Sequence, residues 1–367
     1  MVSAMPDPLP TAGIPASGSP RRAVTWRDTA TVMLAALVTV GAVDWAIQQR
    51  VYPVPPRMAE VVDGLESLAT RDPHLLVLGS SHARSFEPLG RALEAQLQKR
   101  TTLLPVEWGK MSSYEWVMNH RVRPLLAAHA KPSLERVLLV TEWWDGCRPA
   151  EGLGPNIPSR AWTFLDFLRD VAAHGLTAWN QNYLWAHVQH ALTRSVLLRD
   201  RGVGQILDAL RDRVAPRSAE SIQADFDNQV ASWHRMTESA ANDPLCRDGV
   251  EMAALSRILD DLRREDVAVT IVVFPRMPST MTEVARRSTF PKYLADLHGV
   301  ARPRGIPVID WTFTAPLSDV HFMKDFDHLT LEGRETLCRF ALDGDLDFLL
   351  DRRSWRAEPG AGEAARE

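Results

Sequence analysis

Cysteine is scarce in this sequence, which contains three cysteines among 367 residues and none in CxxC spacing. So few cysteines exclude a disulfide-dense scaffold, and their spacing gives no zinc or thiol-redox motif. An excess of charge is also missing, because the formal net charge is −4. A general nucleic-acid-binding or anionic-membrane-binding surface is therefore not expected. The length allows one large domain or two modest ones, and no internal repeat is apparent.

One long apolar run stands near the N-terminus. Residues 1–28 are rich in Pro, Ala, Ser and Gly and are predicted to form a disordered cytoplasmic tail. From Ala30 to Ile47 the only charge is Asp44, and these eighteen residues nearly cross a hydrocarbon core of about 30 Å. We predict a transmembrane signal-anchor over residues 29–49, with the rest of the chain outside the cytoplasm. A cleaved signal peptide with a site near VGA is the alternative.

Beyond a Pro-rich linker, predicted over residues 50–69, strand-like apolar runs alternate with helical patterns. The five runs are HLLVLGS, LLPVEWG, ERVLLVTEWW, VAVTIVVFP and IPVIDWT. Near-continuous apolar strands separated by helices predict an α/β fold with a parallel sheet covered on both faces. We therefore expect a three-layer α/β/α domain with a five-stranded parallel sheet over residues 70–350, followed by a loose tail over 351–367.

The alternation stops after the third strand. Residues 148–245 show helical patterns only, which predicts a helical insertion within the domain. His187 and His190 lie three apart on one of these helices, but they lack further ligands, so no metal site is predicted. After the insertion the α/β rhythm resumes, and Pro291 is expected to interrupt the helix near residues 282–301.

The first predicted strand runs directly into Gly79-Ser80-Ser81-His82. In open α/β sheets ligands bind beyond the carboxyl ends of the strands, where the following helix also directs its N–H groups. Such a turn suits a serine nucleophile, which needs a neighbouring base. Taken alone, a strand that ends in GSS is more often an ordinary loop.

A second polar stretch, FMKDFDHLTLEG, lies at residues 322–333. Asp325 precedes His328 by three positions and Asp327 precedes it by one. Because positions three apart face the same side of a turn, Asp325 is the better partner to orient His328, and Asp327 is expected to point elsewhere. His321 is a spare candidate for the base.

These two stretches resemble the first and last sequence blocks of the SGNH (GDSL-type) hydrolases. The resemblance implies that Ser81 is the nucleophile, His328 the base and Asp325 the orienting carboxylate, with no cofactor. It also implies an oxyanion hole made by the backbone N–H groups of Ser81 and of Gly109, which follows the second strand in VEWGKMSS.

The chain departs from the family pattern in two blocks. Ser80 stands where the family has an aspartate that the triad does not use. In the third block, G-x-N-D, Trp144 replaces the asparagine that donates to the oxyanion. Either the indole N–H of Trp144 or a group from the insertion is expected to replace this donor. Loss of one such donor typically costs about 10²–10³ in rate.

With the predicted anchor, the chain is similar to single-pass SGNH proteins that O-acylate envelope polysaccharides beside a multipass membrane-bound O-acyltransferase. The resemblance implies a periplasmic serine esterase or O-acyltransferase that acts on an acyl-ester or a cell-envelope or exported glycan. The alternative is a non-catalytic glycan-binding or assembly subunit, in which some of the twelve tryptophans stack on sugars.

Two cysteines bracket the insertion. Cys147 follows the third strand, and Cys246 precedes the helix that resumes the α/β pattern. An oxidising compartment would permit a disulfide between them, which makes this pair a candidate bond. The alternative is that all three cysteines are small buried residues. Cys338 lies on the apolar side of the last helix and is predicted to be a buried free thiol.

Overall fold

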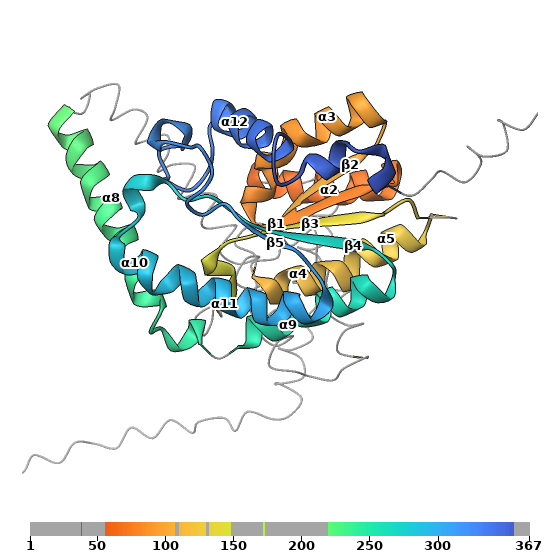
Figure 1. The fold of residues 1–367 in the computed structure, drawn as a ribbon, viewed down its shortest axis with the longest axis horizontal. Coiled ribbons are helices and arrows are strands. Elements are labelled where there is room, and N and C mark those ends of the chain that lie inside the picture. The colour runs from red at the N-terminus through yellow and green to blue at the C-terminus, as the bar shows by residue number, and fades with distance from the viewer. Residues whose placement is uncertain are drawn as a thin grey trace, which may run out of the picture.

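The structure, a computed structural model, describes residues 56–106, 110–129, 132–147, 219–247 and 249–355, with Val38 and Ala172 as isolated positions. At its centre lies a five-stranded sheet (Figure 1) in the order β2-β1-β3-β4-β5, and every neighbouring pair is parallel. The strands are β1 (Leu75–Gly79), β2 (Thr101–Pro105), β3 (Arg136–Thr141), β4 (Ala268–Val273) and β5 (Val308–Asp310). The predicted α/β fold with a five-stranded parallel sheet is confirmed.

Helices cover both faces of the sheet (Figure 1), and β1, β3 and β4 are mostly buried between two apolar cores, whereas the edge strand β5 is half-buried. One face carries α4 (Met111–Val117), α5 (Arg123–Ala127), α9 (Val250–Arg264) and α11 (Thr289–Ala301). The other face carries α3 (Glu87–Leu97) and α12 (Leu331–Leu342). Successive strand residues alternate between the cores, as Leu76 and Val77 do, because side chains along a strand point to opposite faces.

A helix occupies most of the segment predicted to be a linker. The α2 helix spans Pro56–Arg71, so the expected linker over residues 50–69 is wrong from Pro56 onward. Leu65 and Leu68 are buried against the sheet edge, and Cβ on Gly64 would lie 2.6 Å from the carbonyl oxygen of Leu103. The proline-rich start suggested a spacer, but proline fits the first position of a helix, where its missing N–H costs nothing.

Two further boundaries differ from the expectation. The C-terminal tail packs as far as Trp355, whose indole is 5% exposed and donates a hydrogen bond of 2.9 Å to the carbonyl of Leu349. The helical break falls at Ser288, between α10 (Glu283–Arg287) and α11, and not at Pro291. Pro291 lies in the first turn of α11, where a helix tolerates proline.

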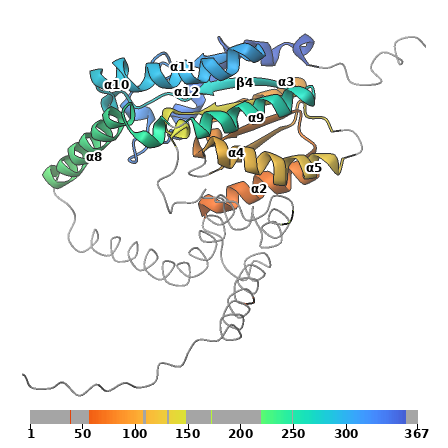
Figure 2. The ribbon, with the colours of Figure 1, turned by 90° about the horizontal axis from the view of Figure 1, so that it is seen from below.

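Helix α8 (Ala219–Ala240) represents the insertion in the described part of the chain, and Figure 2 shows it beside α10. The rest of residues 148–218 lies outside the described residues, apart from Ala172, and so does the predicted anchor over 29–49, apart from Val38. Within the ranges that the structure describes, no helix combines the length and apolar character needed to cross a bilayer.

Candidate active site

The candidate site lies at the carboxyl edge of the sheet, where the strand order reverses between β1 and β3. Ligands of open α/β sheets bind at such a switch point. Ser81 begins the short 3-10 helix η1 (Ser81–Phe86) directly after β1, and Glu142 directly follows β3. Gly79 lets the two strand ends approach, because a Cβ there would collide with the carbonyl oxygen of Val140.

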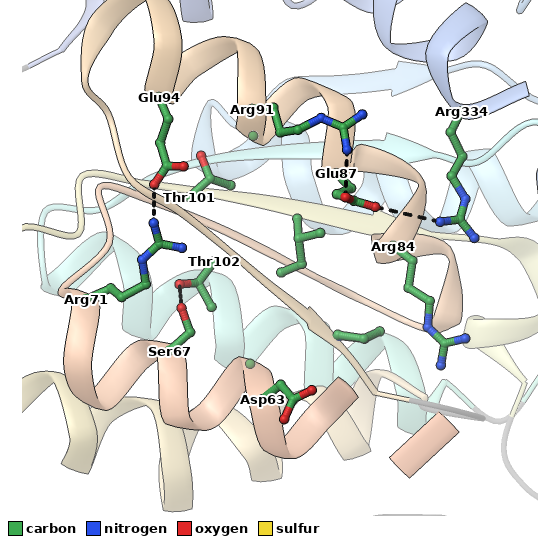
Figure 3. Close-up of a pocket in the computed structure, with 14 residues that line it drawn as sticks. Asp63, Ser67, Arg71, Arg84, Glu87, Arg91, Glu94, Thr101, Thr102 and Arg334 are labelled. Carbon is green, nitrogen blue, oxygen red and sulfur yellow. Dashed lines mark hydrogen bonds and ion pairs between the residues drawn. The ribbon is translucent and has the colours of Figure 1, made fainter. Parts of the chain in front are cut away.

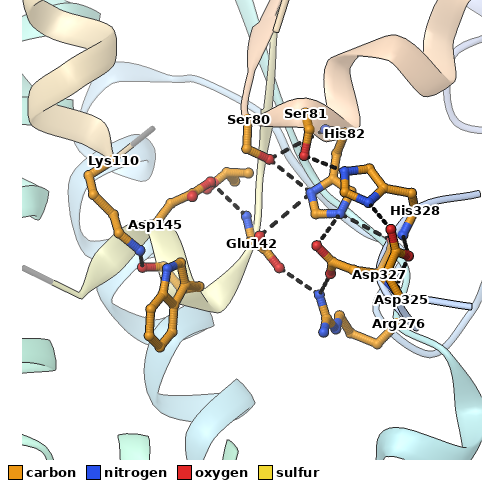
Figure 4. A network of polar contacts seen from close by, with 12 residues as sticks. Ser80, Ser81, His82, Lys110, Glu142, Asp145, Arg276, Asp325, Asp327 and His328 are labelled. Carbon is orange, nitrogen blue, oxygen red and sulfur yellow. Dashed lines mark hydrogen bonds and ion pairs between the residues drawn. The ribbon is translucent and has the colours of Figure 1, made fainter. Parts of the chain in front are cut away.

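Ser81, His328 and Asp325 form a continuous chain of contacts (Figure 4). The Nε2 atom of His328 lies 2.5 Å from Ser81 Oγ, and its Nδ1 lies 2.8 Å from Asp325 Oδ2. The other Asp325 oxygen accepts hydrogen bonds from the backbone N–H groups of Asp327 and His328. The aspartate three positions before the histidine is thus the one that touches it, as the spacing predicted.

The Asp325 carboxylate is held in its charged form. Burial acts to raise its pKa, but the hydrogen bonds and charge of His328 outweigh burial and lower the pKa to about 2. An ionised carboxylate at Nδ1 makes that nitrogen the donor and leaves Nε2 as an acceptor toward the Ser81 hydroxyl. In this tautomer His328 is arranged to take a proton from Ser81.

Four charged side chains meet beside these three residues, and we call them the charge ring: His82, Glu142, Arg276 and Asp327 (Figure 4). Arg276 Nη1 lies 2.6 Å from Glu142 Oε2 and 2.6 Å from Asp327 Oδ1. His82 Nε2 lies 3.3 Å from Asp327 Oδ2, and His82 Nδ1 lies 3.6 Å from Glu142 Oε1. Positive and negative groups therefore alternate around the ring.

Burial and the neighbouring carboxylates act in opposite directions on His82, whose side chain is 1% exposed. Burial lowers its pKa, but the charges of Asp327 and Glu142 outweigh burial and raise the pKa to about 9. Burial likewise acts to raise the pKa of Asp327, and the positive charges of His82 and Arg276 hold it well below its usual range. At neutral pH the ring thus holds two cations and two carboxylates.

His82, Glu142 and Asp327 offer ligand atoms within 4.8 Å of one another, a spacing that a metal ion could bridge. Arg276 Nη1, however, already contacts both carboxylates at hydrogen-bond distance. The guanidinium therefore occupies the place of a cation and supplies the charge that a metal would bring. The imidazole ring of His82 also stacks on the ring of Phe274, with ring centroids 4.1 Å apart.

The expected oxyanion residues have different outcomes. Ser81 is in place at the start of η1, whereas Gly109 lies outside the described residues. Trp144 lies in the 3-10 turn η3 (Trp143–Gly146), where its carbonyl accepts a hydrogen bond of 2.5 Å from Lys110 Nζ and its ring lies 4.1 Å from that ammonium. Among the contacts described for Trp144, none joins its indole to Ser81.

The candidate disulfide is present in the structure. Cys147 and Cys246 are bonded, with Cα atoms 3.8 Å apart across a sequence separation of 99. The bond ties the segment that follows β3, which carries Glu142, to the end of the insertion. Cys338 is a buried free thiol, and burial raises its pKa to about 12.

The spare candidate His321 lies apart from this chain of contacts. It accepts a hydrogen bond of 2.9 Å from the backbone N–H of Ser318 through its Nδ1, which caps a short turn. Sequence reasoning instead missed Arg276 and the structural part played by His82 and Glu142. One available signal was their position, since each follows the carboxyl end of a buried strand.

A pocket of about 400 Å³ lies along the edge strand β2, between α2 and α3, and contains none of the three contact-chain residues (Figure 3). Its charges are largely paired with one another. Glu94 binds Arg71 at 2.6 Å, and Glu87 binds Arg91 at 2.7 Å and faces Arg334 at 4.0 Å. These pairs are partly exposed, so they contribute little energy and indicate no ligand.

No protein-family model, curated protein or solved structure matches this chain. The geometry of the site and the sequence motifs that form it are therefore the features that indicate a function for this chain.

Proposed function

We propose that this chain is an SGNH-type serine enzyme that transfers an acyl group, such as acetyl, to or from a cell-envelope or exported glycan. The observation that carries the proposal is the contact chain from Ser81 Oγ through His328 to Asp325 at the switch point of the sheet. Nucleophile, base and orienting carboxylate stand in the order that acyl transfer requires.

The proposed reaction uses this contact chain. Ser81 Oγ attacks the carbonyl carbon of an acyl ester while His328 Nε2 takes the hydroxyl proton. Asp325 holds the imidazole tautomer and stabilises the imidazolium. The backbone N–H of Ser81 is the proposed first donor to the developing oxyanion, and the backbone N–H of Gly109 is the proposed second donor. His328 returns its proton to the leaving alcohol, and an acceptor hydroxyl then attacks the acyl-enzyme by the same route.

The proposed location is the periplasmic side of the cell membrane, with a single N-terminal anchor. The apolar run from Ala30 to Ile47 supports the anchor, and the Cys147–Cys246 bond suits an oxidising compartment. Such a protein would work beside a multipass membrane-bound O-acyltransferase that supplies the acyl group. We expect the full chain to stay in the membrane fraction after a carbonate wash, whereas a soluble mature chain that starts near Val43 would contradict the anchor.

Labelling with a fluorophosphonate serine probe tests the proposed activity directly. The folded wild-type domain should be labelled at Ser81, and Ser81→Ala should abolish the label. Ser80→Ala is the matched control, because the Ser80 hydroxyl lies 2.8 Å from His82 Nδ1 and is bound there. Labelled peptides should therefore still contain Ser81 in that variant. A folded wild-type domain that takes no label would overturn the proposed enzyme activity and favour the alternative of a glycan-binding subunit.

A further inference from the structure

The charge ring joins the two segments that carry the reacting side chains. His82 follows Ser81 in η1, and Asp327 precedes His328 in the loop over residues 322–330, which we call the His328 loop. The side chains of His82 and Asp327 form an ion pair, and His82 Nε2 also lies 3.2 Å from the backbone carbonyl oxygen of Asp327. The ring therefore holds the backbone of the loop directly against η1.

The His328 loop has a conformation that needs such support. Phe326, between Asp325 and Asp327, has φ of 64°, which a side-chain-bearing residue rarely adopts. Its ring is buried and meets Phe226 of α8 edge-on at 5.0 Å. A strained residue persists where its surroundings over-determine it, and such residues cluster at functional sites.

The rest of the ring is braced from other elements. Arg276, 4% exposed, lies 4.7 Å from the ring centroid of Trp233 on α8 while its Nη1 contacts both carboxylates. Glu142 directly follows β3, so its place depends on the sheet. Taking four charges out of water is costly, and isolated buried ion pairs are often no more stable than apolar packing. Stability alone therefore gives no reason for the ring.

We infer that the charge ring is a positioning device, in which His82 acts through Asp327 to set the distance between His328 Nε2 and Ser81 Oγ. The inference deepens the proposed function, on which it rests, by assigning the residues that align its base. Removal of one ring member leaves a buried charge without its counter-charge, whereas removal of two opposite charges restores the balance.

The ring also has a defined dependence on pH. His82 faces Asp327, Glu142, Arg276, the Ser80 hydroxyl and the His328 ring, whose centroid lies 5.5 Å away. Its charge also acts on the buried Asp145, which follows Glu142 in η3. Because its pKa is raised to about 9, His82 carries a proton at neutral pH and loses it above that value. Deprotonation then leaves two carboxylates facing one guanidinium, which should loosen the His328 loop.

The first experiment follows His82 and the loop without using activity. NMR of the protein with ¹³C-labelled histidine should show one imidazole, absent in His82→Gln, that titrates near pH 9. Hydrogen exchange should show protection of the His328 loop reduced about tenfold in His82→Gln at fixed pH. A His82 imidazole that titrates near the unperturbed value of about 6.5, or unchanged protection of the His328 loop in His82→Gln, would overturn the positioning role.

The second experiment is a charge-balance cycle read by the rate of Ser81 labelling. His82→Gln and Asp327→Asn should each slow labelling by about 10- to 10²-fold, since a displacement of about 1 Å costs up to 10²-fold. The double variant should label no more slowly than the slower single variant, because opposite charges leave together. A double effect equal to the product of the two single effects would contradict the ring.

Lys99 and Glu135 provide the matched control, as a buried ion pair at 2.9 Å outside the ring. Lys99→Met should lower stability yet leave labelling per folded molecule within about twofold of wild type. The rate of Ser81 labelling in wild type should fall as pH rises through about 9, and this fall should be absent in His82→Gln. If the ring titrates and protects the loop while Ser81 takes no label, the proposed function fails and the positioning role of the ring stands.

Discussion

Two aspartates of the same loop lie in contrasting surroundings. Asp325 is 43% exposed and contacts His328, three residues away, whereas Asp327 is 20% exposed and contacts Arg276 and His82, which are 51 and 245 residues away in sequence. Phe326 between them adopts a left-handed conformation that turns the two carboxylates apart. The local half of the loop thus forms the candidate reaction centre, and the long-range half anchors it.

Removing one carboxylate charge at a time should give the largest difference between Asp325 and Asp327. Asp325→Asn should lower turnover by up to ~10⁴, because an amide at Nδ1 no longer enforces the tautomer that leaves Nε2 as acceptor. Asp327→Asn should have the smaller effect given above, because it acts on position and not on protonation. Steady-state hydrolysis of a small acyl ester measures both, and equal effects would show that the two carboxylates are not divided in this way.

Removal of the Cys147–Cys246 disulfide tests how much this bond stabilises the segment that carries Glu142, one of the partners of Arg276 in the charge ring. Cys147→Ser/Cys246→Ser should lower the free energy of unfolding by up to ~4.7 kcal/mol, because the bond closes a loop of about 100 residues in the unfolded chain. Urea unfolding measures this change, with Cys338→Ala as the control for loss of a buried sulfur. If the double variant and Cys338→Ala lose the same free energy of unfolding, the disulfide stabilises the protein no more than the packing of one buried sulfur does.

Asp325 and His82 should also respond to opposite ends of the pH range, and Asp327, whose pKa is held well below its usual range, adds to the acidic end. The pKa of Asp325 is lowered to about 2, so its contribution to stability is present above its unfolded value of about 3.8 and is lost as pH falls through 2. The pKa of His82 is raised to about 9, so its contribution is full below about 6.5 and is lost as pH rises through 9.

Unfolding midpoints measured across pH separate these two contributions. Asp325→Asn should flatten part of the acidic side of the stability curve and leave the alkaline side nearly as in wild type. His82→Gln should flatten the alkaline side and also weaken the acidic side, because the charge of His82 helps to hold the pKa of Asp327 low. Flattening of both sides by Asp325→Asn would show that Asp325 and the charge ring titrate as one unit.

The smallest effect is expected at His321, seven residues before His328. Its Nδ1 accepts from the N–H of Ser318, and its carbonyl accepts from the N–H of Thr330. Because the second contact uses the backbone, His321→Gln should keep it and change turnover by less than about threefold. A loss comparable with that of His328→Gln in the same esterase assay would make His321 a member of the reaction centre.

Much of the fold followed from local pattern. Each of the five apolar runs forms a strand. For β1, β3 and β4 the physical reason is burial on both faces, which suits a run of consecutive apolar side chains. Helix α2 was missed because its proline-rich start resembles a spacer, and only its packing of Leu65 and Leu68 against the sheet reveals it. The pairing of Asp325 with His328 followed from their spacing, which is a local property, whereas the role expected of Ser81 came from the resemblance to the SGNH hydrolases.

The sequence by itself determined the five strands and their alternation with helices, the serine at the end of the first strand, and the aspartate that meets His328, because each depends on neighbours within a few residues. Only the tertiary structure decided the charge ring. Its members come from η1, the ends of β3 and β4, and the His328 loop. Their positions after strand ends place them at one edge of the sheet, but their spacing along the chain does not show which side chains meet. The parallel sheet brings those ends to one edge, where low solvent access makes opposite charges interact strongly.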